Sequence, residues 1–181
     1  MTSIEPLAVH ADAVDEAKTY LRIEHDEEDA LIASMIAVAI RHGEGFTRTI
    51  FITRNCRARM PVSTAWQRLI ETPVSAIIGV DGVPGSGPGF TLPSTAYALD
   101  IDSNGDGWVR TTDPGASRWI EASYRAGLAD DWAALPEALR QGVLRLTAHL
   151  HAVRDDPNDA GPPAAVAALV RATGVDVIAG Q

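Results

Sequence analysis

The sequence predicts an α+β protein that is mainly α: a bundle of three main helices with an inserted small antiparallel β region and a C-terminal helical arm. Three observations lead to this fold class. They are helical periodicity toward both ends of the chain, short alternating apolar runs in its middle third, and a breaker-rich segment after the last long helix. The 181 residues suit one globular domain with an appendage, and 46% are hydrophobic. That content excludes a disordered acidic chain. A membrane span is not expected either, because the sequence lacks a run of about 18 apolar residues.

Two helices are expected in the first fifty residues. A short amphipathic helix over about 13–23 is followed by a longer one over about 27–47, and Asp26 and Asp29 between them are spaced like a capping box. The predicted main apolar stripe of the longer helix consists of Leu31, Met35, Val38 and His42. The residues that widen this stripe are Ile32, Ile36, Ala39 and Ile40. A helix apolar on so many sides is expected to be largely buried, in a core or in an oligomer.

From residue 50 the apolar period changes from helical to alternating. Short strands are expected over about 50–124, beginning with Ile50 and Ile52 and including the apolar run 74–80. The segment 81–89 contains four glycines and two prolines, too many for the interior of a strand, so a mobile loop is expected there.

A third helix is expected over about 136–154, where helical periodicity returns. Its apolar stripe is Leu139, Val143, Leu146, Leu150 and Val153. Residues 1–155 then form the main domain, and the breakers after it predict a linker over 156–163. The remaining segment, 164–181, can form one short helix that is marginal alone in water, so this arm is expected to dock on its own domain or on a partner.

Charge is unevenly distributed along the chain, whose formal net charge is −9. Residues 1–31 and 71–113 carry net charges of −7 and −5, whereas residues 41–68 carry +5. Such bands suit a protein that meets partners on distinct surfaces, and the solvated faces of an acidic protein explain them equally well. The acidic N-terminus does not resemble a secretion signal, so the protein is expected to stay in the cytoplasm after synthesis.

The sequence contains no recognisable catalytic constellation. Cys56 is the only cysteine, which excludes an internal disulfide and a cysteine-based zinc cluster, and no histidine lies near it in sequence. His149 and His151, two residues apart on a helix, point to nearly opposite sides and cannot share one ion unaided. We therefore expect neither enzymatic activity nor a cofactor. The arginines around Cys56 favour salt bridges, within or between subunits, over phosphate binding, because no other basic stripe accompanies them.

The sharpest local motif lies at residues 102–113. Oxygen-bearing side chains stand at positions 1, 3, 5 and 12 of this loop with a glycine at position 6, which is the spacing of calcium loops; they are Asp102, Asn104, Asp106 and Asp113. The same segment contains Asn-Gly and Asp-Gly, the strongest hairpin-turn dipeptides. A β-hairpin is the favoured interpretation, and a calcium-binding or calcium-stabilised interaction module is the alternative.

Several short stretches stand out when they are taken in order along the chain. They are Ala17–Ile32, Thr72–Val74, Tyr124–Gly127, Leu135–Leu146 and Arg154. The first combines Leu-Arg-Ile, an acidic break and Asp-Ala-Leu-Ile at the start of a long helix, and the third reads Tyr-Arg-Ala-Gly. In this order they resemble the bacteriophage head–tail connector (adaptor) proteins of long-tailed phages, including the adaptor of phage-like gene transfer agents. Together these stretches cover about residues 13–155, and the resemblance implies that this part of the chain is a connector domain.

The resemblance implies a structural protein without catalysis. About twelve copies would form a ring between the portal protein and a stopper (head-completion) or tail protein, and DNA would pass through it without sequence-specific binding. The ring would assemble in the bacterial cytoplasm, end at the head–tail interface of the particle, and involve no membrane. The arm would grip the portal through Val166, Leu169, Val170, Val175, Val177 and Ile178. Charges expected to pair between subunits or rings are Arg54, Arg57, Arg59, Asp26, Glu27 and Glu28.

Overall fold

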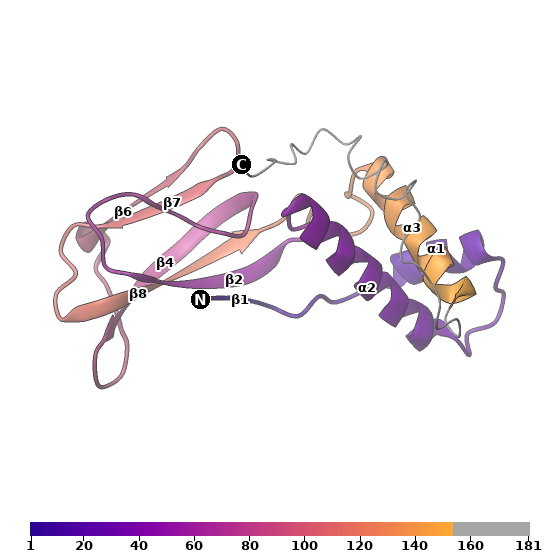
Figure 1. Cartoon of the computed structure of the whole chain (residues 1–181), viewed down its shortest axis with the longest axis horizontal. Helices are drawn as coiled ribbons and strands as arrows, with labels where there is room; N and C mark the ends of the chain where they lie inside the picture. Colours follow the sequence, from indigo (N-terminus) through magenta and orange to yellow (C-terminus); the bar gives the residue numbers. More distant parts are fainter. Residues whose placement is uncertain (154–181) are drawn as a thin grey trace. The chain divides into compact units, whose positions relative to one another are not determined.

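The computed structural model describes residues 1–153, in which three α-helices and eight β-strands take similar shares of the chain (Figure 1). The helices are α1 (Ala11–Leu21), α2 (Asp29–Thr47) and α3 (Glu137–Ala152). The α+β class with an antiparallel β region is confirmed, whereas a mainly α helical bundle is not. Two strands, β4 (Val74–Pro84) and β8 (Ser117–Ala126), are 11 and 10 residues long, and their length gives sheet a larger share than short apolar runs indicate.

The described residues divide into two compact units. The β unit consists of Met1–Pro6 and Thr53–Leu128, and the helical unit consists of Leu7–Ile52 and the described residues from Ala129 on. The β unit includes an N-terminal strand, β1 (Thr2–Ile4), which the sequence analysis missed because three residues are too few for an alternating pattern. The linker 156–163 and the arm 164–181 lie outside the described residues.

One hydrophobic core holds the helical unit together. Its buried residues include Ala13, Val14 and Ala17 of α1, Ile32, Ile36, Ala39 and Ile40 of α2, and Leu139, Val143 and Leu146 of α3. Within each set the residues are one, three or four positions apart, as on one face of a helix. Full burial of one valine, leucine or isoleucine side chain stabilises the fold by about 1.5–3 kcal/mol. Ile50 and Ile52, expected in a strand, lie outside the named strands, and Ile52 joins this core.

The buried face of α2 differs from the predicted main stripe. Met35 is buried as expected, but Leu31, Val38 and His42 are exposed. The residues expected only to widen the stripe form the buried face instead. Sequence periodicity could not choose between these faces, because apolar residues occur on nearly every side of the first three turns.

The β unit contains two antiparallel sheets. The larger has the order β1-β2-β8-β4-β5, with β2 at Arg54–Pro61 and β5 at Phe90–Thr91. The smaller has the order β3-β7-β6, and its strands are Gln67–Arg68 (β3), Gly107–Thr111 (β7) and Tyr97–Ile101 (β6). A 3-10 turn, Ser94–Ala96, precedes β6. The larger sheet buries one face, with Cys56, Ala58, Ile120, Ala122, Tyr124 and Ala126. The smaller sheet meets it where the backbone of Gly107 lies against Val74.

The glycine- and proline-rich segment is shorter as a loop than the sequence predicts. Strand β4 continues through Pro84, paired with β8 along its length apart from three register shifts and with β5 at Asp81 and Gly82. Only residues 85–89 therefore connect β4 to β5. A Cβ on Gly82 would overlap the Ser117 hydroxyl oxygen and lie 2.8 Å from the Phe90 ring. This glycine therefore reflects close approach inside a sheet and not a flexible loop.

Candidate functional site

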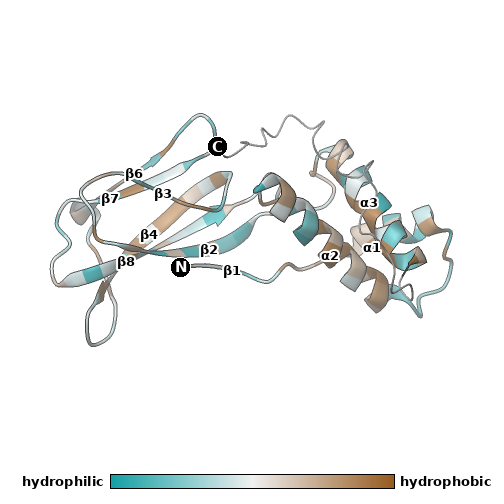
Figure 2. Cartoon of the chain, viewed as in Figure 1, coloured by the Kyte–Doolittle hydropathy of each residue, from teal (hydrophilic) through white to brown (hydrophobic). Residues whose placement is uncertain are grey.

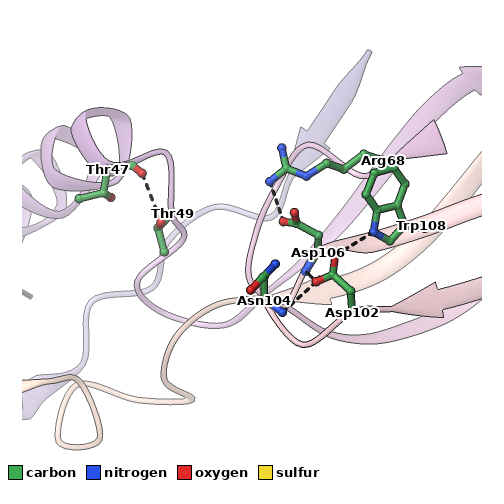
Figure 3. Close-up of polar contacts among 7 residues, drawn as sticks. All are labelled: Thr47, Thr49, Arg68, Asp102, Asn104, Asp106 and Trp108. Carbon is green, nitrogen blue, oxygen red and sulfur yellow. Dashed lines mark hydrogen bonds and ion pairs between the residues drawn. The ribbon is translucent and has the colours of Figure 1, made fainter. Parts of the chain in front are cut away.

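The segment 102–113 contains the turn and the second strand of the β-hairpin β6–β7, and carboxylates of the turn hold it in place (Figure 3). Asp102 Oδ1 accepts hydrogen bonds from the backbone N–H groups of Asn104 (2.9 Å) and Asp106 (3.0 Å), and Asp102 Oδ2 accepts one from Trp108 Nε1 (3.1 Å). These bonds, that of Trp108 above all, lower the pKa of Asp102. Arg68 binds Asp106 at 2.6 Å. The hairpin interpretation is confirmed.

The calcium interpretation gains no support from this geometry. Asp113 lies beyond the end of β7, and its Oδ1 accepts a hydrogen bond from the backbone N–H of Gly115 at 3.3 Å. Within residues 1–153, no group of three or more His, Cys, Asp or Glu side chains is placed to hold a metal ion.

The arginine cluster is divided between two faces of β2. Because side chains alternate along a strand, Arg57 and Arg59 share one face, whereas Arg54 lies on the face of buried Cys56 and Ala58. The sequence places these arginines together, but the strand lets only two of them act on the same partner.

Arg57 and Arg59 belong to the face of the larger sheet that faces away from the β core, called here the open sheet face. Directly opposed residues of an antiparallel sheet lie on one face, so the register between β2 and β8 defines its other members. They are Asn55, Pro61, Trp119, Glu121, Ser123 and Arg125. The Arg59 guanidinium lies 5.8 Å from the centre of the Trp119 ring, and Arg57 lies 3.8 Å from Glu121. Tryptophan and arginine are the residues most often found at the energetic centres of protein interfaces.

The predicted acidic cluster is used largely inside the helical unit. Lys18, the only lysine of the chain, is buried and binds Asp26 at 2.5 Å and Asp29 at 2.7 Å. The bond from Lys18 holds the pKa of Asp26 below its ordinary value. The expected capping box is therefore absent, because both carboxylates bind this ammonium group and no side chain caps α2. Glu28 lies 3.3 Å from His151, whereas Glu27 is exposed.

A further candidate surface, missed by the sequence analysis, is the exposed side of α2, called here the α2 outer face. It consists of Ala30, Leu31, Ser34, Val38, Arg41 and His42. Figure 2 shows how hydrophobic the first part of this helix is. The signal that could have found it is the absence of acidic residues on any exposed position of α2 after its first residue.

The predicted portal anchors, from Val166 to Ile178, lie outside the described residues. Among the helices of residues 1–153, none combines the length and apolar character needed to cross a bilayer.

Comparison with known proteins relates this arrangement to particle necks. Residues 11–76, from the start of α1 into β4, match the family model described as phage gp6-like head-tail connector protein. Among solved structures, a chain in the neck of an empty gene transfer agent particle, computed with C6 symmetry, is 26% identical with a TM-score of 0.75, and the match covers 95% of this chain and 94% of that chain. The predicted resemblance to phage head–tail connectors is confirmed.

Two further chains share this connector-like fold. One, from the virion of a native gene transfer agent particle, is 26% identical with a TM-score of 0.73, over 95% of this chain and 94% of that chain. Another, from the neck of a native particle computed with C12 symmetry, is 25% identical with a TM-score of 0.72, over 95% of this chain and 93% of that chain. No curated protein matches the chain.

Proposed function

We propose that this chain is a structural head–tail connector, or adaptor, in the neck of a tailed phage or a gene transfer agent particle. The observation that carries the proposal is its likeness, over 95% of its length, to chains in the necks of gene transfer agents. A match that includes both compact units supports a shared role better than a match to one widespread fold would. The surfaces of the protein then serve as joints between proteins, and the role includes no catalytic step.

In the proposed neck, about twelve copies form a closed ring between the portal protein and a stopper or tail protein. The C12 symmetry of one matching neck supports this copy number. A ring of this kind uses two different surface patches on each copy, one for each neighbour. The copies are made in the bacterial cytoplasm and end at the head–tail interface.

The charge of the chain supports a channel through which DNA passes without being held. At −9 per chain, twelve copies carry on the order of −100 charges. Proteins that hold DNA do so mainly through cationic contacts with its phosphates, so an acidic ring disfavours binding.

The arm is the proposed portal-binding segment. The described residues of the helical unit share one hydrophobic core, so deletion of residues 161–181 is expected to leave a folded protein that no longer binds the portal. Co-sedimentation with purified portal measures this, and circular dichroism checks the fold. Unimpaired attachment of the truncated chain would contradict the proposal.

The open sheet face is the second proposed joint. Arg57 and Arg59 are exposed there and lie outside the β core, Arg59 beside Trp119 and Arg57 at 3.8 Å from Glu121. Exposed arginines of this kind suit pairing with acids of a neighbouring subunit or ring. Arg54 is left out of this contact because it lies on the other face of β2. Of the predicted acidic partners, Asp26 and Glu28 contact Lys18 and His151 inside their own unit, so Glu27 is the one best placed for an external contact.

A deletion mutant tests the proposed function. In a strain that produces the particles, loss of this chain is expected to leave DNA-filled or emptied heads separate from finished tails, because the joint between them is missing. Electron microscopy of the lysate counts free heads, free tails and complete particles. Complete, infective or gene-transferring particles in the mutant would contradict the proposal.

A further inference from the structure

The α2 outer face is unusually apolar for the exposed side of a surface helix. Leu31 is 40% exposed and Val38 is 49% exposed, one on each side of exposed Ser34. These positions follow the three- and four-residue spacing of a single helical stripe. Surface helices ordinarily carry charged residues there, so an apolar stripe in this place indicates contact with another protein surface.

The charges of this face identify the kind of partner it fits. Arg41 is its only fully charged residue, joined by His42, and the one acidic residue in the second half of the helix, Glu44, is buried and accepts a hydrogen bond from the backbone N–H of Phe51 at 2.9 Å. The face is therefore apolar and weakly cationic within an acidic chain. A complementary surface has to be acidic and to offer an apolar or aromatic side chain.

The exposed side of α1 has these properties. Asp12 and Asp15 are exposed one turn apart, and Tyr20 is 47% exposed at the end of the same helix. The only cation of α1, Lys18, is buried against Asp26 and Asp29. The exposed side of α1 within Ala11–Leu21, called here the α1 outer face, thus carries negative charge and no positive charge, and the exposed Arg22 follows at the end of the helix.

The two faces cannot meet within one chain. Helices α1, α2 and α3 pack around a common core through Ala17, Ile36 and Leu139 among others, so their outer faces point away from it in different directions. One copy can therefore present α1 to one neighbour and α2 to the other. Two different patches of this kind are what a head-to-tail ring requires, whereas a two-fold contact would close at a dimer.

Resting on the proposed function, we propose that the α2 outer face packs against the α1 outer face of the next copy of this chain, so that helical units join head to tail around the ring. Leu31 and Val38 fill the contact, and the small residues Ala30 and Ser34 let the helices approach closely. Arg41 lies opposite the carboxylates of Asp12 and Asp15 of the neighbour.

Cysteine cross-linking tests the pairing of faces. The native Cys56 is buried, so added surface cysteines react selectively. In the full-length protein assembled in particles, the Val38→Cys/Asp15→Cys double variant treated with a short bismaleimide is expected to give a ladder from covalent dimers up to the whole ring. Each single variant is expected to stay monomeric on a denaturing gel. Dimers from Val38→Cys alone would indicate a two-fold contact, and a double variant without a ladder would equally overturn the proposal.

A charge exchange tests the ionic part. Arg41→Glu is expected to reduce the number of assembled rings at least tenfold, and the added changes Asp12→Arg and Asp15→Arg are expected to restore them. Arg145→Glu, at an exposed arginine of α3 outside both faces, is the matched control and should assemble like wild type. If Arg41→Glu assembles normally, the inference is wrong while the connector function stands. If wild-type protein is absent from particles, the proposed function itself is wrong.

Discussion

Lys18 shows how one residue fixes the corner between two helices. Its side chain is 11% exposed, and its ammonium group binds two carboxylates that follow it by 8 and 11 residues. Arg22, in the left-handed conformation at the end of α1, turns the chain so that these acids return to Lys18. A buried ammonium without partners would be strongly unfavourable, so these pairs are a condition of the local fold. The sequence shows that Lys18 is the only lysine, but it does not predict which carboxylates bind it, because those contacts depend on the geometry of the turn after α1.

Replacement of Lys18 by methionine is expected to lower the melting temperature by a few degrees at neutral pH. Both ion pairs are lost, and the half-buried Asp29 keeps its charge without a partner. Thermal unfolding followed by circular dichroism measures the change. The exposed Arg145→Met variant, which changes the same charge by the same amount, should melt close to wild type.

The difference between wild type and Lys18→Met should also depend on pH. The pKa of Asp26 is lowered from 3.8 by its bond from Lys18, so its contribution is present above that value and lost as the pH falls through the lowered pKa. The pKa of Lys18 is raised from 10.5, first by Asp26 and then by Asp29, so its contribution is complete below 10.5 and lost at still higher pH. A difference in melting temperature that persists undiminished in strong acid would contradict the role given to these pairs.

Gly105 and Gly87 offer a matched pair of glycine substitutions. Both have positive φ, +80° and +93°, so alanine costs about 1–2 kcal/mol of backbone strain at either position. A Cβ at Gly105 would also lie 2.7 Å from the Pro73 side chain, whereas nothing lies within 4 Å at Gly87. Gly105→Ala should therefore lower the free energy of unfolding in urea by more than Gly87→Ala does. Equal effects would mean that the hairpin turn is not packed against Pro73.

At the scale of elements, the sequence correctly predicted the helices and strands in which the periodicity of the apolar residues is unambiguous. The hairpin around residues 102–106 lies where it was expected, and so do Leu139, Val143 and Leu146 of the predicted α3 stripe. Leu150 is only partly buried, and Val153 lies just beyond the end of the helix. The buried face of α2 and the length of β4 were missed for physical reasons. Apolar residues surround the first three turns of α2, and the glycines that suggested a loop at Gly82 are required by packing between strands. Arg54 was grouped with Arg57 and Arg59 because the three are close in sequence, although side chains along a strand alternate between its two faces.

The hairpin β6–β7 is not expected to bind calcium. The Asp102 carboxylate already accepts three hydrogen bonds, and Asp106 is paired with Arg68. The melting temperature should therefore be the same in excess calcium and in excess chelator. A rise of several degrees with calcium would instead mean that the ion binds the folded state, and the alternative function would return.

At the scale of the molecule, the sequence predicted the class of protein better than the surfaces through which it would contact other proteins. The order of short stretches from Ala17 to Arg154 was enough to predict the resemblance to head–tail connectors, because that order reflects the whole arrangement of elements. The candidate surfaces were harder, since each depends on which side of an element is exposed. The α2 outer face and the open sheet face were identified only once burial separated them from the core.

The most direct test of the central claim is a neck reconstruction from purified particles of the strain that encodes this chain. We expect a ring of density around the DNA channel, between portal and tail, into which the helical unit and the β unit of this chain each fit. Adjacent copies should join through α2 of one and α1 of the next. A neck ring built from another protein, with this chain absent from the particle by mass spectrometry, would contradict the claim.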